Sequence, residues 1–198
     1  PVTQDELDAR PLPFLLAHPL SDSEVLGLDP TSVAVEYKWD GIRAQLIKTH
    51  ETIRLWSRGD QDITEQFPDI VEDATTLPSQ IILDGEILAG TPEELQTFNE
   101  LQTRLNRKRV TQNLLKTNPT FFKAYDLLRL DGEDMRGRHL VVRKDALAKI
   151  NVIQSRVLYP TSNQDIKAMR QKARAESAEG VMIKHQQSTY TGGRKAGH

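Results

Sequence analysis

The sequence predicts a mixed α+β domain with largely antiparallel sheets. Several short segments have the pattern of strands, either apolar and polar residues in alternation or a short apolar run. They outnumber the strand–helix–strand units that the helical segments could form, and parallel strands need such crossovers. The chain has 198 residues, enough for one domain with a sizeable core. The strand segments are 33–46 (two strands), 52–56, 81–88, 121–128 and 178–185.

Composition excludes several kinds of site. The chain has no cysteine, which excludes disulfides, thiolate metal sites and cysteine nucleophiles and fits a reducing compartment such as the cytoplasm. The net charge is −2, so a nucleic-acid partner would have to meet a local basic patch. No apolar run is long enough to span a membrane, and no signal peptide is recognisable. Both ends look like cuts in a longer protein, and we expect residues 1–198 to be one domain of it.

The chain begins with a lead-in and a hairpin. Residues 1–30 carry five of the prolines and are expected to pack irregularly along the domain. In residues 33–46, Asp40-Gly41 predicts a two-residue turn between two strands. That register would place Lys38 opposite Arg43, with Glu36 beside them. A guanidinium next to the amine would favour its neutral, nucleophilic form.

The next segments lead to a buried carboxylate. A third strand at 52–56 is followed by a polar loop at 57–64 and a helix from Pro68 to Leu77. The apolar run 81–88 predicts a strand covered on both faces and interrupted at Asp84-Gly85. Because an unpaired buried carboxylate is costly, Glu86 on that strand should face a pocket or a cation.

A helix is predicted to start at Thr91, since Pro92 and Glu94 fit its first turn. Its apolar stripe would be core. Four cations gather at the predicted C-terminal end of this helix, where they would either complement the helix dipole or contact a phosphate backbone. The stripe is Leu95, Phe98, Leu101 and Leu105, and the cations are Arg104, Arg107, Lys108 and Arg109.

The C-terminal half completes the pattern. Strand 121–128 is followed by a turn at Asp131-Gly132, and helices are predicted at 140–150 and 165–177, the second capped by Ser162. On the last strand, 178–185, the side chains of Met182 and Lys184 share one face.

Charged side chains in or beside apolar strands suggest one site. Together they supply cations for phosphate, two carboxylates for Mg²⁺ or a ribose, and nearby aromatic residues for a base. Phosphoryl and nucleotidyl transfer need such a site, because positioning and charge neutralisation supply most of the rate. No Gly-x-x-x-x-Gly-Lys-Ser/Thr loop is present, so the site is not a P-loop. The charged residues are Lys38, Arg43, Arg58, Glu86, Glu179 and Lys184.

The ordered set of motifs resembles the adenylylation (nucleotidyltransferase) domain of ATP-dependent DNA ligases, and of their bacterial members in particular. The family's nucleophile motif matches Glu-Tyr-Lys-Trp-Asp-Gly-Ile-Arg, and four further motifs follow in the family's order. The resemblance implies the fold shared by ligases and capping enzymes, which is ATP-grasp-like. The matching segments are 36–43, 57–70, 83–86, 122–128 and 179–184.

The resemblance also implies roles for the residues that match. Lys38 would attack the α-phosphate of ATP and hold AMP as a phosphoramidate, with Arg43, Lys184 and the metal favouring its neutral amine. The backbone of Glu36 would meet adenine, Glu86 would hold a ribose hydroxyl or a metal ion, and Glu179 a metal ion. Arg58 would contact the ribose and later the 5′-phosphate of a nick, and Lys184 the α-phosphate. Tyr125 and Met182 would enclose adenine, with Phe122 as the other candidate for stacking.

The resemblance further implies Mg²⁺ or Mn²⁺ as metal and nicked double-stranded DNA as partner. It suggests a monomer in the bacterial cytoplasm, on the nucleoid, that serves DNA repair, replication or recombination. In the family a further strand with phosphate-binding lysines and an OB-fold domain follow a segment like 193–198, and neither is present in this sequence. We therefore expect this fragment to adenylylate itself poorly and not to seal nicks efficiently alone.

Three other interpretations stay open at this point. An RNA ligase or an mRNA-capping guanylyltransferase uses the same Lys-x-Asp-Gly logic, although segment 57–70 favours a DNA ligase. An NAD-dependent ligase would need an extra N-terminal domain, of which the chain shows no sign. A catalytically silent module that binds nicks would more often carry a clear basic excess.

Overall fold

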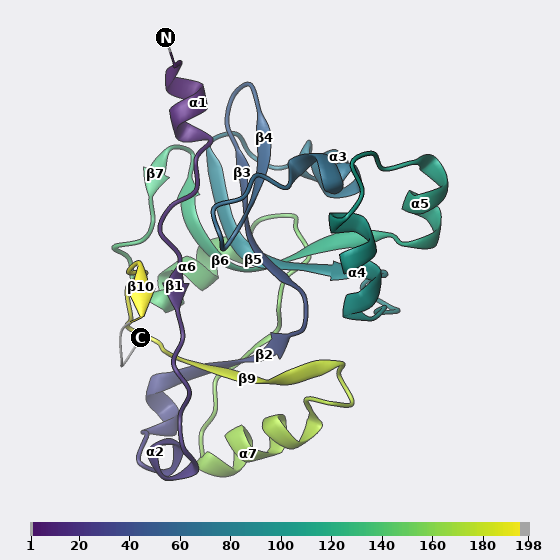
Figure 1. The fold of residues 1–198 in the computed structure, drawn as a ribbon. Coiled ribbons are helices and arrows are strands. Elements are labelled where there is room, and N and C mark those ends of the chain that lie inside the picture. The colour runs from purple at the N-terminus through teal and green to yellow at the C-terminus, as the bar shows by residue number, and fades with distance from the viewer. Residues whose placement is uncertain (1, 195–198) are drawn as a thin grey trace.

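The computed structural model describes residues 2–194, in which two main sheets face each other (Figure 1). A pocket lies between them, and a third sheet has only two short strands. The larger sheet has the strand order β4-β3-β5-β6-β7 and the smaller one β8-β2-β9. All pairings within these two sheets are antiparallel, which confirms the predicted fold class. The strands are β2 (Val33–Trp39), β3 (Ile42–Lys48), β4 (Ile53–Ser57), β5 (Ile81–Ala89), β6 (Thr120–Leu130), β7 (Glu133–Asp134), β8 (Val157–Leu158) and β9 (Ala178–His185).

Helices cover the outer faces of both sheets. In Figure 1, α7 lies beneath the smaller sheet, and α3, α4 and α5 lie at the upper right beside the larger one. The helices are α1 (Gln4–Asp8), α2 (Asp22–Leu26), α3 (Pro68–Ala74), α4 (Phe98–Leu105), α5 (Gln112–Thr117), α6 (Leu140–Leu147) and α7 (Asn163–Lys172), with 3-10 turns η1 (Pro30–Ser32) and η2 (Thr64–Gln66).

The predicted hairpin at 33–46 is wrong, because β2 and β3 belong to different sheets. Lys38 lies opposite Gly180 of β9, and Arg43 lies opposite Glu86 of β5. The chain crosses from one sheet to the other at Asp40-Gly41 instead of turning back. A Cβ on Gly41 would lie 2.2 Å from the carbonyl oxygen of Ile87. Glycine is required there because the backbone approaches β5 closely, and not because the chain makes a tight turn.

The core of the larger sheet is built around β5. Leu83 and Ile87 are fully buried and pack with Phe67, Ile70 and Leu101 from the helical side. On the opposite face, Ile82 packs in a second cluster with residues of β3, β6 and the N-terminal segment. Both faces of β5 are therefore covered, as its continuous apolar run predicts. The strand is not interrupted at Asp84-Gly85 but carries a register shift there against β6.

The smaller sheet has its own core beneath it. Val33 and Val35 of β2 pack against Ile166 and Met169 of α7. The predicted cap is confirmed: Ser162 accepts a hydrogen bond from the backbone of Asp165 in a capping box. The helix begins at Asn163 and ends at Lys172, before the predicted end at residue 177, and β9 has the predicted bounds.

The helix predicted from Thr91 begins only at Phe98. Residues 91–94 form a turn, in which the amide of Glu94 donates to the carbonyl of Thr91 at 3.1 Å. An isolated bridge between Gly90 and Leu95 holds this turn as an extension of β5. The residues of the helix-start pattern form only this turn, because the backbone bridge between Gly90 and Leu95 outweighs the local preference for a helix. Leu95 consequently lies outside the helical stripe.

Arg104 of α4 is a structural residue and not a surface cation. Its guanidinium has no solvent exposure and bonds to Asp69 at 2.6 Å and to the carbonyl of Gln66. Asp69 in turn accepts from the backbone amide of Thr120 at 2.9 Å. This network ties α4 to α3 and β6. The suggestion that Arg104 contacts a phosphate backbone is therefore wrong.

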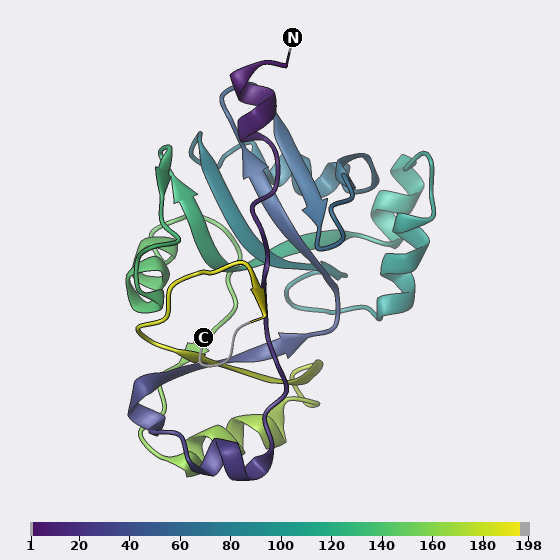
Figure 2. The same ribbon diagram turned by 60° about the vertical axis from the view of Figure 1, so that its left-hand side comes forward.

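The N-terminal segment is more regular than predicted and packs along the domain as expected (Figure 2). Its helices α1 and α2 each start with a capping box, at Thr3 and Ser21, a signal that the prediction of an irregular lead-in did not use. Between them the chain forms β1 (Leu15–Leu16), which pairs in parallel with β10 (Gly193–Arg194). We call residues 9–20 the strap, because this stretch runs across the edge of both sheets.

Candidate active site

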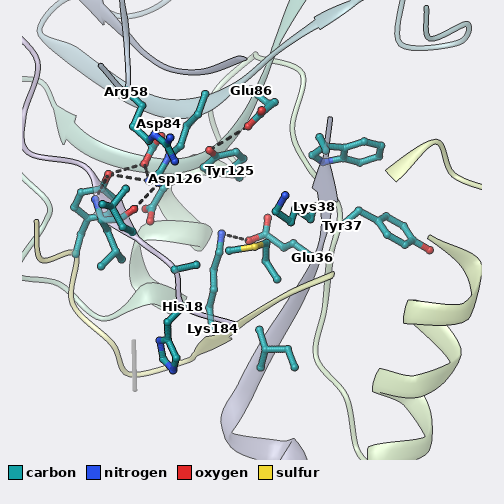
Figure 3. Close-up of a pocket in the computed structure, with 18 of the residues that line it drawn as sticks. His18, Glu36, Tyr37, Lys38, Arg58, Asp84, Glu86, Tyr125, Asp126 and Lys184 are labelled. Atoms are coloured by element: carbon teal, nitrogen blue, oxygen red, sulfur yellow. Dashed lines mark hydrogen bonds and ion pairs between the residues drawn. The ribbon is translucent and has the colours of Figure 1, made fainter. Parts of the chain in front are cut away.

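A pocket of about 720 Å³ lies between the two sheets. This volume is within the range of about 300–1,000 Å³ that small-molecule sites occupy. The strap forms part of its wall through Leu15, Leu16 and His18. Apart from the alternative Phe122, the residues assigned a site role from the sequence line it: Glu36, Lys38, Arg43, Arg58, Glu86, Tyr125, Glu179, Met182 and Lys184. The structure thus brings together side chains from β2, β3, β5, β6, β9 and the loop after β4 (Figure 3).

Lys38 lies near the end of β2 and forms an ion pair with Glu179 of β9. Both side chains are about half exposed, at 53% and 42%. The register between β2 and β9 shifts just after Lys38, and such irregularities re-aim side chains. The amine is therefore accessible from the pocket and from solvent, and its partner is a carboxylate.

Glu36 lies two residues before Lys38, so both side chains project from the same face of β2. Its carboxylate is almost fully buried, at 1% exposed, and bonds to two lysines. Lys144 and Lys184 each lie 2.6 Å from one of its oxygens. The Glu36 side chain thus has a charge partner on both sides, a feature that the sequence did not suggest.

Arg43 is directed at Asp84 of β5 and not at Lys38. Its Nη2 lies 2.7 Å from Asp84 Oδ2, which also accepts a hydrogen bond from the hydroxyl of Tyr190 at 2.6 Å. A further bond joins Nη1 to the carbonyl oxygen of Leu15 in the strap at 2.5 Å. The expected cross-strand contact of Arg43 with Lys38 is absent, because the two strands are in different sheets. Arg43 instead fastens the strap to the larger sheet.

Glu86 faces the pocket, which confirms the expectation from its place in an apolar strand. Burial raises the pKa of Glu86 to about 8, although the charges of Arg43 and Lys38 oppose the shift. The hydroxyl of Tyr125 donates to its carboxylate at 3.4 Å (Figure 3). Around neutral pH, this carboxyl is therefore mainly in its protonated form.

The two residues expected to enclose a base both line the pocket. Tyr125 projects from β6 and Met182 from β9, where Met182 lies opposite Glu36. The ammonium of Lys184 lies 4.8 Å from the centre of the Tyr125 ring. Phe122, the alternative for stacking, is wrong: its ring is buried in the core of the larger sheet against Gly85. Phe122 and Ala124 point to the core face of β6, and Tyr125 points to the other face.

Arg58 is exposed in the loop after β4 and lines the pocket, with its backbone amide donating to the carbonyl of Arg43 at 3.2 Å.

Several pocket residues were missed by reasoning from the sequence. Asp126 on β6 forms a buried pair with Arg143 of α6 at 2.8 Å, and this partner lowers the pKa of Asp126 against the effect of burial. Asp126, like Glu86, is a charge within an apolar strand, so the same reasoning could have found it. Arg143 also lines the pocket, whereas Lys144 does not line it and bonds to Glu36. Neither carried such a signal, because helices commonly expose cations.

Within residues 2–194, no group of three or more histidine, aspartate or glutamate side chains is placed to hold a metal ion. Glu86 and Glu179 remain the two predicted metal ligands that line the pocket, and carboxylate oxygens are the ligands that Mg²⁺ prefers. The same part of the chain contains no helix with the length and apolar character needed to cross a membrane.

Comparison with known proteins identifies relatives of this chain. A family model described as ATP dependent DNA ligase domain matches residues 14–198. A DNA ligase of Sulfophobococcus zilligii is 35% identical over 92% of this chain and 32% of its own length. A probable DNA ligase of Koribacter versatilis is 30% identical over 94% of this chain and 37% of its own length. The chain thus spans about a third of the length of these curated relatives. One is archaeal and one bacterial, so a particular similarity to bacterial members stays a prediction.

Solved structures share the fold. The ligase domain of M. tuberculosis LigD has a TM-score of 0.72 and 27% identity, over 96% of this chain and 58% of that one. The Chlorella virus DNA ligase-adenylate has a TM-score of 0.68 and 17% identity, over 93% of this chain and 64% of that one. The predicted nucleotidyltransferase fold is confirmed by these likenesses.

Proposed function

Because the chain belongs to the ATP-dependent DNA ligase family, we propose that it is the adenylylation domain of such a ligase. One observation carries the proposal. A single pocket collects a reachable lysine, an exposed arginine, carboxylates and an aromatic ring from separate segments of the chain. These are the groups that transfer of a nucleotidyl group from ATP requires. The chain spans about a third of the length of its curated relatives, so the activity of the whole protein is part of the proposal.

In the proposed first step, Lys38 attacks the α-phosphorus of ATP. The lone pair of Nζ forms the N–P bond while the bond from phosphorus to the bridging oxygen breaks, and pyrophosphate leaves. Lys38 must give up protons to solvent, which its half-exposed position allows. Glu179 holds the ammonium form before the reaction, so its carboxylate must release Lys38 for the attack.

The remaining pocket residues position the nucleotide. Adenine lies between Tyr125 and Met182 and meets the backbone of Glu36, and its ribose contacts Glu86 and Arg58. Lys184 neutralises the α-phosphate. The separation of these groups over two sheets fits a ligand that extends from a base to a phosphate chain.

Two carboxylates are candidates for holding a divalent ion. Glu179 is exposed at the pocket and Glu86 has an unusually high pKa, which a nearby cation would lower. When bound, Mg²⁺ or Mn²⁺ neutralises charge on the phosphates. An ion drawn to Glu179 would compete with the Lys38 ammonium for its carboxylate.

The second step transfers AMP from Lys38 to the 5′-phosphate of a nick in double-stranded DNA, and Arg58 holds that phosphate. The oxygen of the 5′-phosphate attacks phosphorus, and the N–P bond breaks and returns the lysine. We expect a monomer that acts on nicked duplex in the cytoplasm.

Intact-mass measurement tests the first step. Incubation with ATP and Mg²⁺ should add one adenylyl group, which pyrophosphate removes, and Lys38→Ala should abolish the addition. Lys167→Ala is the matched control, because Lys167 is an exposed lysine on α7 away from the pocket. The measurement uses the natural full-length protein as well as residues 1–198. An unmodified mass of the full-length protein would overturn the proposal.

A further inference from the structure

Lys144 is a buried lysine that the proposed chemistry leaves unused. It lies on α6 with its side chain 6% exposed, and among the described residues it is not one of those that line the pocket. Its ammonium lies 2.6 Å from Glu36 Oε1 and 2.5 Å from the carbonyl oxygen of Tyr125. A buried ammonium is costly, which points to a role beyond packing.

Glu36 is shared between two lysines of different exposure. Lys184 bonds to Oε2 at 2.6 Å, and its side chain is 20% exposed on the pocket side, where it reaches over Tyr125 (Figure 3). Lys144 is enclosed and has a second acceptor on β6. Lys184 is therefore the lysine that can leave Glu36 for a ligand, and Lys144 is the one that stays.

Without Lys144, release of Lys184 would leave the buried Glu36 carboxylate without a charge partner. The Glu36 carboxylate is 1% exposed, and removing the sole partner of a buried carboxylate is strongly unfavourable. Lys144 keeps Glu36 paired when Lys184 leaves. The two lysines also repel each other, and this repulsion acts with burial to lower the pKa of Lys144. Departure of Lys184 relieves that repulsion.

We propose that Lys144 is a positioning residue that frees Lys184 to bind the α-phosphate of ATP. Without nucleotide, the Glu36 carboxylate pairs with both Lys184 and Lys144. Once the nucleotide is bound, Lys144 alone pairs with Glu36. This inference rests on the proposed function, since it takes a nucleoside triphosphate as the ligand.

The test measures the affinity of a noncleavable analogue, α,β-methylene-ATP, by calorimetry, with adenosine as the phosphate-free comparison. Lys144→Met should weaken binding of the analogue about tenfold, the scale of one charge-assisted hydrogen bond. Adenosine binding should change by less than about twofold, because Lys184 acts on phosphate. Thermal unfolding of each variant establishes that it is folded.

A mutant cycle separates positioning from general damage. In a K184M background, adding K144M should change analogue affinity by less than about twofold, since there is no Lys184 left to release. K144M/E36Q should bind the analogue better than K144M alone, because the neutral amide no longer holds Lys184. Structural damage would instead make the losses add in both double variants, and that outcome would overturn the inference.

The two proposals fail differently. Analogue binding with the predicted cycle but no adenylyl-Lys38 would overturn the proposed function and leave this inference standing. Adenylylation that K144M reduces equally in the Lys184 and K184M backgrounds would overturn this inference alone. A wild-type protein that binds no analogue would overturn both. If K144M does not fold, Lys144→Gln is tested in the same cycle, and the same additive result counts against the inference.

Discussion

At the scale of single residues, Glu86 is a pocket residue whose burial lowers the stability of the fold when its carboxyl is charged. Its carboxyl is held where water is scarce, which raises its pKa to about 8. Such a group favours folding in its neutral form and opposes it when charged. A buried, charged Glu86 carboxylate destabilises the folded protein. A ribose hydroxyl or a cation bound beside it would offset that cost, which explains why a binding pocket contains such a residue.

This pKa predicts how stability depends on pH. The folded pKa is above the unfolded value of 4.5, so the stabilising contribution of neutral Glu86 is full below pH 4.5 and is lost as pH rises through about 8. Glu86→Gln should therefore come within about 1 kcal/mol of the wild type at pH 5 and exceed it at pH 9 by at most about 5 kcal/mol. Denaturant unfolding at both pH values measures this. Glu65→Gln, at an exposed site, is the control, and an equal difference at both pH values would contradict the prediction.

The residues found from sequence share one signature. Glu86 and Lys184 stood out because charge within an apolar strand is costly and needs a use. Lys144 and Tyr190 could not be found in this way, since a cation on a helix and a tyrosine in a loop are ordinary. Their importance comes from partners more than a hundred residues away, Glu36 and Asp84.

At the scale of elements, the sequence predicted most strands and misplaced one connection. Periodicity depends on which faces are buried, so β9 was identified with its observed bounds and β5 and β6 with small errors in their ends. Pairing depends on the rest of the sheet, and Asp40-Gly41 gave a hairpin signal for a chain that passes between sheets. The helix start at Thr91 failed for a related reason, because bonds to β5 outweighed it.

The loop after α4 carries a prediction about DNA. Arg107, Lys108 and Arg109 are exposed there, whereas Arg104 is buried. Reversal of the three exposed charges to glutamate should weaken binding of nicked duplex and reduce its salt slope by about 1 for each phosphate that these cations neutralise in the wild type. The expected yield of adenylyl-Lys38 is unchanged.

Matched variants make that test specific. K167E/K172E/R174E carries the same change in charge on exposed positions in and just after α7, below the smaller sheet in Figure 1. Fluorescence anisotropy across a salt series compares the two triple variants. Equal salt slopes for both would exclude the loop after α4 as a specific DNA-binding surface.

At the scale of the whole molecule, side chains of the larger sheet hold the strap in place. The side-chain amide of Gln45 bonds to both the amide and the carbonyl of Leu12, at 2.8 and 2.7 Å. Trp56 donates to the carbonyl of Ala9 at 2.8 Å, and Arg43 bonds to Leu15. The larger sheet thus holds the segment that continues into the pocket wall, and fold and site depend on one another.

Gln45→Leu tests this dependence. It leaves the backbone groups of Leu12 without partners and should lower the free energy of unfolding by about 2 kcal/mol. Limited proteolysis should then cut first within residues 9–20, and ATP should slow that cleavage. Gln112→Leu, exposed on α5, should leave both the stability and the cleavage pattern as in the wild type. First cleavage elsewhere in the Gln45 variant would refute a holding role for this side chain.

The crossing at Asp40-Gly41 has a mechanical consequence. Lys38 stands two residues before the covalent joint between the sheets, and Gly41 is pressed against β5 at that joint. If the sheets swing apart to admit a ligand, points near the pivot travel least and points at the far rim travel most. The attacking amine would keep its place while Lys184, four residue pairs further along the β2–β9 ladder, sweeps a wider arc.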